Sequence, residues 1–254
     1  MRNALQRLIF MTNLLTLRLV TSSFRFRQFI VRQHLCAMKV GTDGTLLGAW
    51  AAGGKSILDI GTGTGLIALM MAQRFDEALV TAIDIDGDAC RQAFDNVDGS
   101  PFCQRIKVRH CSLQDFVEEH NEEGCGIFDA IVCNPPFYDG SLPCPDKRRS
   151  IARHDTSLSC DELFAGAARL LAPDGEFSLI IPASRRKAFE TAAVFAGMHI
   201  WRVRGVKTTQ SKPASRCLMS FGLHPFTEQQ VSRAELVIDS DEYKHLTEPF
   251  YLSR

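Results

Sequence analysis

From Ser56 onward, short apolar runs alternate along the chain with stretches whose apolar residues recur at helical spacing. A short apolar run between turn residues is typical of a buried strand, and apolar residues three or four positions apart are typical of an amphipathic helix. The predicted strands cover residues 56–60, 79–85, 105–110, 128–133, 176–182, 199–206 and 216–223. The predicted helices cover residues 65–75, 88–97, 112–120, 159–175 and 188–198, the fourth beginning after an N-cap at Ser159 and ending at Gly175.

This alternation of strands and helices predicts βαβ units around a parallel sheet. We therefore expect an α/β fold with a seven-stranded, mostly parallel sheet, helices on both of its faces, and an antiparallel hairpin made by the last two strands. No internal repeat, low-complexity segment or linker divides residues 23–254, so this range is expected to form a single domain.

The first 22 residues start with basic side chains and continue with an apolar middle, as a secretory signal does. Asn13, Thr16 and Arg18 interrupt the apolar run, and no small-residue cleavage site follows it. The run is also too short and too polar for a membrane span. We interpret residues 1–22 as an N-terminal extension that is helical or disordered.

The charge is balanced overall and uneven locally. The formal net charge is zero, and 45% hydrophobic and 23% charged residues are typical of a soluble globular protein. Residues 1–40 nevertheless hold seven Arg or Lys and no acid, and a second basic run spans residues 185–216. The nine cysteines include no C-x-x-C pair, so we expect neither a disulfide framework nor a metal site, and a reducing, cytoplasmic location.

The segment "LDIGTGTGL" joins the first predicted strand to the first predicted helix, with Asp59 followed by Gly61, Gly63 and Gly65. Glycines at the start of a helix allow a tight turn and a close approach of the backbone to a ligand. The spacing is G-x-G-x-G rather than the dinucleotide G-x-G-x-x-G, which favours an adenosine ligand without a pyrophosphate. An acid at the end of the second strand can bind the ribose hydroxyls; Asp84 is the first candidate and Asp86 the alternative.

A second motif, Asn134-Pro135-Pro136-Phe137 followed by Tyr138, comes directly after the apolar strand 128–133. The amide oxygen of Asn134 and the carbonyl of Pro135 can accept the hydrogens of an amine, and the aromatic rings can stack on a planar base. The sequence therefore predicts that this motif orients an amine that is conjugated to a ring. A rigid strand-to-loop turn is the structural alternative.

Together "LDIGTGTG", "IDID" and "NPPF" resemble the class I S-adenosylmethionine-dependent methyltransferases that methylate planar nitrogens, a Rossmann-like family. The resemblance implies that the glycine turn and Asp59 lie at the cofactor's methionine part, that Asp84 binds its ribose, and that Asn134 faces its methyl group. The family usually places an acid after the third strand, at the adenine of the cofactor. Here Ser112 occupies that place and Asp115 lies one helical turn later, and which of the two contacts the adenine stays open.

The stretch 24–51, with "MKVGTDGTLLGAW", more narrowly resembles the bacterial tRNA1(Val) (adenine(37)-N6)-methyltransferase family, as do "NPPFYDGSL" and "RRSIARH". This resemblance implies transfer of a methyl group to the N6 amine of an adenine beside a tRNA anticodon. It also places Gly41, Thr42 and Asp43 beside the cofactor. From the residues alone, the three form a polar turn before an apolar helix, with Asp43 as a possible N-cap.

Three groups of basic residues are candidate contacts to tRNA phosphates. They are Arg25 with Arg27; Arg148 and Arg149 with Arg153 and His154; and Lys207 with Lys212 and Arg216. Phe24, Phe26 and Phe29 alternate with the first group. They either stack on bases or form a half-buried strand.

Several alternatives remain open at this level. The target could be a guanine N2 in ribosomal RNA or a glutamine in a release factor. From other classes, the chain could be an RNA chaperone that binds the cofactor without turnover, or an oxidoreductase. Leu66 argues against the oxidoreductase because it breaks the dinucleotide spacing. We expect a monomer with no membrane partner.

Overall fold

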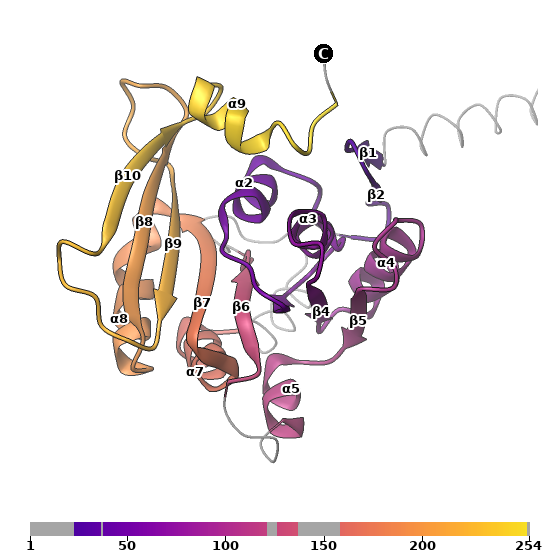
Figure 1. The fold of residues 1–254 in the computed structure, drawn as a ribbon, viewed down its shortest axis with the longest axis horizontal. Coiled ribbons are helices and arrows are strands. Elements are labelled where there is room, and N and C mark those ends of the chain that lie inside the picture. The colour runs from indigo at the N-terminus through magenta and orange to yellow at the C-terminus, as the bar shows by residue number, and fades with distance from the viewer. Residues whose placement is uncertain (1–22, 37, 121–125, 137–157, 253–254) are drawn as a thin grey trace, which may run out of the picture.

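A computed structural model describes residues 23–36, 38–120, 126–136 and 158–252. Its centre is a sheet in the order β10-β8-β9-β7-β6-β3-β4-β5 (Figure 1). The strands of this sheet are β3 (Ser56–Ile60), β4 (Leu79–Asp84), β5 (Ile106–His110), β6 (Phe128–Cys133), β7 (Leu171–Pro182), β8 (His199–Lys207), β9 (Arg216–Gly222) and β10 (Ser232–Val237). Two short strands, β1 (Ser23–Arg25) and β2 (Ile30–Arg32), form a separate antiparallel hairpin.

The helices connect the strands and cover the sheet. They are α2 (Thr42–Trp50), α3 (Leu66–Arg74), α4 (Gly87–Asp98), α5 (Leu113–Glu119), α7 (Cys160–Leu170), the 3-10 turn η1 (Ala183–Arg185), α8 (Arg186–Phe195) and α9 (Asp241–Thr247). None of the helices in the described ranges is long and apolar enough to cross a membrane.

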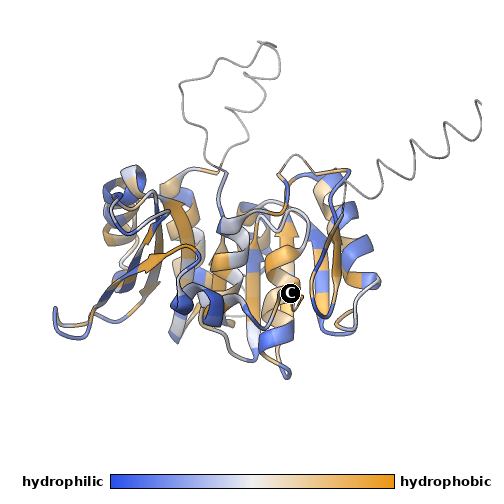
Figure 2. Ribbon diagram, turned by 90° about the horizontal axis from the view of Figure 1, so that it is seen from above, coloured by the Kyte–Doolittle hydropathy of each residue, from blue (hydrophilic) through white to orange (hydrophobic). Residues whose placement is uncertain are grey.

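The alternation of side chains along each strand builds two hydrophobic cores, one on each face of the sheet. Successive strand residues point to opposite faces. Ile57 therefore packs in the core under α2 and α3, and Leu58 packs in the core under α5 and α7. Figure 2 shows the hydrophobic colour concentrated in the strands at the centre of the molecule. Burial on both faces explains why these strands read as continuous apolar runs in the sequence.

The predicted α/β class is confirmed. β3, β4, β5, β6 and β7 run parallel, and β9 is antiparallel to both β7 and β8. The sheet also has an eighth strand, β10, which pairs in parallel with β8 at the edge. Sequence reasoning missed β10 because, on this edge strand, only Leu236 is fully buried, so no apolar run marks it.

The end of the fourth predicted helix is wrong by several residues. Ser159 caps α7 as expected, with its side chain and that of Glu162 forming a reciprocal capping box. The helix ends at Leu170 rather than at Gly175, because Pro173 disfavours helical backbone at the residue before it. Gly175 lies in β7, where a Cβ would stand 3.0 Å from the carbonyl oxygen of Asp129 on β6.

Two glycines let α2 pack closely on α3. A Cβ on Gly48 would lie 2.8 Å from the sulfur of Met70, and one on Gly44 would lie 3.2 Å from Leu66. Both helices begin beside the carboxyl ends of β3 and β6, where ligands bind in open α/β sheets. The close packing therefore sets how far the first turn of α2 stands from the glycine turn that precedes α3.

Candidate active site

The turn between β3 and α3 contains three glycines with left-handed backbone. The φ angles of Gly61, Gly63 and Gly65 are 69°, 56° and 80°, a region that other residues rarely adopt. A Cβ on Gly61 or Gly63 would meet no atom within 4 Å. The backbone of the turn is thus open on the side where a ligand can approach, and side chains are excluded there by backbone conformation rather than by lack of space.

Two carboxylates hold this turn in place. Asp59 lies beneath it and is fully buried; its Oδ2 accepts hydrogen bonds from the Thr62 hydroxyl at 2.6 Å and the Ala68 N–H at 3.1 Å. Asp84 lies beside it at the end of β4, and its Oδ2 accepts a hydrogen bond from the Gly63 N–H at 2.8 Å. Asp59 therefore supports the turn from inside the protein, which is a different position from the direct cofactor contact that the resemblance implies.

Burial dominates the electrostatics of both acids. Burial raises the pKa of Asp59 to about 7, against the lowering effect of its two hydrogen bonds. Burial also raises the pKa of Asp84 above its ordinary value. Oδ1 of Asp59 is buried and has no hydrogen-bond partner among the described residues, which makes its ionised form costly.

A segment from the N-terminal side forms the opposite wall of the site. Asn96 on α4 accepts a hydrogen bond from the Arg32 N–H and donates to the carbonyls of Arg32 and Thr64, each at 2.8 Å. Gln92, one helical turn earlier, accepts from the Leu35 N–H at 3.1 Å. These buried amides fasten residues 32–35 to α4, and the chain then runs to Met38 and the start of α2.

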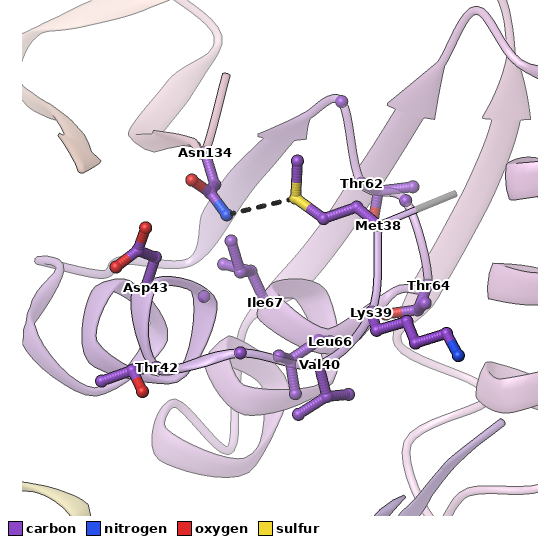
Figure 3. A pocket seen from close by; sticks show the side chains of 14 residues that line it. Met38, Lys39, Val40, Thr42, Asp43, Thr62, Thr64, Leu66, Ile67 and Asn134 are labelled. Atoms are coloured by element: carbon purple, nitrogen blue, oxygen red, sulfur yellow. Dashed lines mark hydrogen bonds between the residues drawn. The ribbon is translucent and has the colours of Figure 1, made fainter. Parts of the chain in front are cut away.

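Asn134 lies at the carboxyl end of β6 and points toward Met38 (Figure 3). Its Nδ2 is 3.8 Å from the sulfur of Met38, a weak acceptor. Its Oδ1 is buried and has no hydrogen-bond partner in the described part of the chain. An unpartnered buried acceptor is costly in a folded protein, so this oxygen marks a place where a ligand donor fits.

These elements enclose a cavity of about 320 Å³, within the range of small-molecule sites. Figure 3 shows the segment from Met38 to Asp43, the glycine turn and Asn134 around it. The described residues that line it are Met38, Lys39, Val40, Gly41, Thr42, Asp43, Gly44, Gly61, Thr62, Gly63, Thr64, Leu66, Ile67 and Asn134. Three segments far apart in the sequence thus meet at the carboxyl edge of the sheet.

The acids after β4 and β5 take separate positions. Asp86 is exposed and caps α4 by accepting a hydrogen bond from the Asp88 N–H, so Asp84 is the better placed of the two candidate ribose acids. After β5, the Ser112 hydroxyl donates to Asp115 Oδ2 at 2.6 Å and accepts from the Asp115 N–H at 3.0 Å. Ser112 and Asp115 are therefore joined to each other at the end of α5 that faces this edge.

Asp43 forms an ion pair with a residue distant in sequence. Oδ2 of Asp43 accepts a hydrogen bond from Nε of Arg216, at the start of β9, over 2.7 Å. The expectation that Asp43 is an N-cap is wrong, because α2 begins at Thr42 and its N-cap is Gly41. Asp43 thus lies in the first turn of α2, between the cavity and β9.

The family model for the methyltransferase small domain matches residues 44–202. A tRNA1(Val) (adenine(37)-N6)-methyltransferase from Phocaeicola vulgatus is 46% identical over 91% of this chain and 97% of its own length. Relatives with the same name from Bacteroides fragilis and Parabacteroides distasonis are 44% and 41% identical over 90% of this chain and 97% of theirs. The chain belongs to this methyltransferase family.

Solved structures support the methyltransferase fold. A predicted O-methyltransferase from Agrobacterium tumefaciens has a TM-score of 0.62 at 18% identity and covers 84% of this chain and 99% of its own. A geranyl diphosphate C-methyltransferase from Streptomyces coelicolor has a TM-score of 0.51 at 12% identity, covering 71% and 78%.

The residues predicted to contact RNA differ in their exposure: some are on the surface and others are buried in the core. Arg25 and Arg27 are exposed on the N-terminal hairpin and do not line the cavity, and Lys212 is exposed in the β8–β9 connection. Phe26 and Phe29 are 2% and 4% exposed and stack on each other, so they belong to the core rather than to an RNA surface. Lys207 on β8 pairs with Glu235 at 2.7 Å. Phe137, Tyr138, Arg148, Arg149, Arg153 and His154 lie outside the described residues.

Several residues that line or support the cavity were not predicted from the sequence. Met38, Thr62 and Thr64 line it and lie inside the two quoted motifs, whose glycines and acids carry the recognisable spacing. Gln92 and Asn96 had a usable signal, since two amides one turn apart on the buried side of a predicted helix require partners. No group of three or more His, Cys, Asp or Glu that could hold a metal ion is present in the described ranges.

The raised pKa of Asp59 predicts a pH dependence of stability. In the folded methyltransferase Asp59 keeps its proton up to about pH 7, whereas in the unfolded chain it loses it near pH 4. Its contribution to stability is therefore present below about pH 4 and is lost as the pH rises to about 7, on the order of 4 kcal/mol in total. Asp59→Asn removes this titration.

Urea unfolding of both forms between pH 5 and pH 8 tests this expectation. The stability of Asp59→Asn relative to the natural protein should rise with pH from 5 to about 7 and level off above that. Parallel stability curves for the two proteins would show that Asp59 titrates normally in the folded state.

Proposed function

We propose that this protein transfers a methyl group from S-adenosylmethionine to the N6 amine of adenine 37 in tRNA1(Val). The relatives that carry this name match nearly the whole chain, including the N-terminal segment that precedes the family model. The observation that carries the proposal is the buried Oδ1 of Asn134, which has no hydrogen-bond partner among the described residues and lines the same cavity as the glycine turn.

The residues of the cavity fit S-adenosylmethionine. The open backbone at Gly61 and Gly63 suits the methionine part, close to the first turn of α2 with Gly41, Thr42 and Asp43. The carboxylate of Asp84, held by Gly63, suits the ribose hydroxyls. When bound, this cofactor supplies an electrophilic methyl group on a sulfonium. The proposed adenine contact is at Ser112 and Asp115, beyond the end of β5.

The chemistry expected of Asn134 follows from the weakness of its substrate as a nucleophile. An amine conjugated to a purine ring has a delocalised lone pair. The Asn134 Oδ1 and the Pro135 carbonyl, by accepting its two hydrogens, would aim the nitrogen and draw it toward tetrahedral geometry. Orientation of this kind supplies about 7–11 kcal/mol in favourable systems. Pro136 restricts the backbone here, and Phe137 and Tyr138 are proposed to stack on the base.

The phosphate contacts proposed for the tRNA are the cations Arg25, Arg27, Arg148, Arg149 and Lys212. The pairing of Arg216 with Asp43 gives that arginine a different role, at the wall of the cavity.

Methylation of separate substrates tests the proposal, with Asn134→Ala as the matched variant. Purified protein receives S-adenosylmethionine with unmodified tRNA1(Val), with ribosomal RNA, or with a release factor, and the products are read by mass spectrometry. We expect N6-methyladenosine from the tRNA alone, formed about 10²–10³ times more slowly by Asn134→Ala, with cofactor binding unchanged. Product on ribosomal RNA or on protein would replace the proposed substrate, and normal turnover of Asn134→Ala would remove Asn134 from the mechanism.

A second pair of variants separates the two acids after β4. Asp84→Asn weakens the acceptors for the ribose hydroxyls and for the Gly63 N–H, so the dissociation constant for S-adenosylmethionine should rise by roughly tenfold or more. Asp86→Ser removes a neighbouring carboxylate but keeps a side chain that caps α4, so binding should stay unchanged. Calorimetric titration measures both. The reverse ranking of the two variants would assign the ribose to Asp86.

A further inference from the structure

Two exposed segments lie side by side at the carboxyl edge of the sheet, next to the cavity. β7 runs parallel to β6 with Leu179 opposite Cys133, so β7 reaches past Asn134 before it ends at Pro182. Pro182 pairs with Arg216 on β9, and the Ala183 N–H donates to the Ser215 carbonyl at 3.1 Å. Residues 183–187 and 208–215 are therefore neighbours, and we call them together the donor edge. β7, β8 and β9, which lead into it, lie together in Figure 1.

The donor edge is connected directly to the cavity through one ion pair. Arg216, the residue after the second segment, reaches Asp43 in the cavity wall. Its guanidinium is thus directed toward the cavity, whereas the side chains of Arg185, Lys187 and Lys212 are exposed to solvent. An RNA strand that delivers a base to Asn134 also extends out of the cavity, and the donor edge is a surface beside the cavity that this strand can follow.

The chemistry of the donor edge is that of an anion-binding surface. No Asp or Glu occurs from residue 182 to 189, or from 208 to 227. The exposed side chains in the two segments are mostly cations and hydroxyls, beside the exposed Gln210 and Pro213: Ser184, Arg185, Lys187, Thr208, Thr209, Ser211, Lys212 and Ser215. Arginine, lysine, serine and threonine are the side chains that most often bind phosphate oxygens in nucleic-acid complexes.

Cations along the neighbouring strand β8 are neutralised. Arg202, Arg204 and Lys207 on β8 pair with Glu176, Glu242 and Glu235. By contrast, no acid within the described ranges pairs with Arg185, Lys187 or Lys212. These unpaired cations lie together beside the cavity and create a local positive field. The net charge of zero gives no sign of this field, because acids elsewhere in the chain balance the cations.

We propose that the donor edge binds the phosphate backbone of the RNA strand that carries the target adenine. The proposal rests on the proposed function and names the surface that holds its substrate. A single phosphate would bind such an exposed row of donors weakly. A polyanion that binds along the row releases several counterions, and this release favours binding. Arg185 and Lys187 thereby join Lys212 as RNA contacts, and Arg216 is a positioning residue for Asp43.

The test compares two triple charge reversals of equal size. One reverses the donor edge, with Arg185→Glu, Lys187→Glu and Lys212→Glu. The control reverses Arg91, Arg233 and Lys244, exposed cations on α4, β10 and α9 that each pair with a nearby acid. A third protein, with glutamine at the three donor-edge positions, removes the charges without adding acids. Binding of unmodified tRNA1(Val) is measured over a series of salt concentrations, together with the KM of both substrates and kcat.

We expect the donor-edge reversal to raise the KM for tRNA and to reduce the slope of log affinity against log salt by about 2 to 3. The glutamine protein should show the same change in slope, and in both proteins the KM for S-adenosylmethionine and kcat at saturating tRNA should stay unchanged. Equal salt slopes for the donor-edge and control proteins would overturn the proposal. So would an effect confined to the KM for S-adenosylmethionine.

Failure of the proposed function gives a different pattern. If the natural protein methylates ribosomal RNA rather than tRNA, the same series is run on that RNA. A reduced slope there would support the donor edge and discard only the tRNA. If the natural protein methylates tRNA normally and the donor-edge reversal behaves like the control, the donor edge alone is refuted.

Discussion

The turn from Gly61 to Gly65 is the constraint on which the rest of the site depends. It is held by a buried carboxylate from below, Asp59, and by a second carboxylate from the side, Asp84. The left-handed backbone of the glycines excludes side chains at Gly61 and Gly63, where nothing lies within 4 Å of an added Cβ, and α3 follows immediately. With the Asn96 amide, which donates to the Thr64 carbonyl, these two acids fix the turn against which the other walls of the cavity are placed.

The other walls are positioned relative to this turn by close packing and buried amides. Gly44 and Gly48 let α2 approach α3, and Asn96 joins the N-terminal segment to Thr64 within the turn itself. β6 then delivers Asn134 from the other side, at the same edge of the sheet. The result is an amide oxygen with no donor among the described residues, beside a turn that is open at Gly61 and Gly63; the first suits a substrate amine and the second an adenosine cofactor.

Local patterns predicted the strands, the glycine turn, the acid after β4 and the motif that begins at Asn134, since each is encoded by neighbouring residues. Contacts between distant residues were beyond such patterns. The Asp43–Arg216 pair joins positions 173 apart, and it ties a predicted RNA-contacting arginine to the cavity wall. Burial of Phe26 and Phe29 depends on Tyr251 and Phe102, which no periodicity relates to them. β10 is stabilised by pairing along an edge and carries too few apolar residues to be recognised.

The central claim is that Asn134 and Asp84 hold the two reacting partners in one cavity. A crystal structure with S-adenosylhomocysteine and the unmodified anticodon stem-loop of tRNA1(Val) tests it most directly. The account predicts the ribose hydroxyls on the carboxylate of Asp84 and the N6 amine of adenine 37 within hydrogen-bond distance of Asn134 Oδ1, with the flanking phosphates along residues 183–187 and 208–215. A cofactor bound away from the glycine turn, or an adenine that reaches the cavity without touching Asn134, would contradict it.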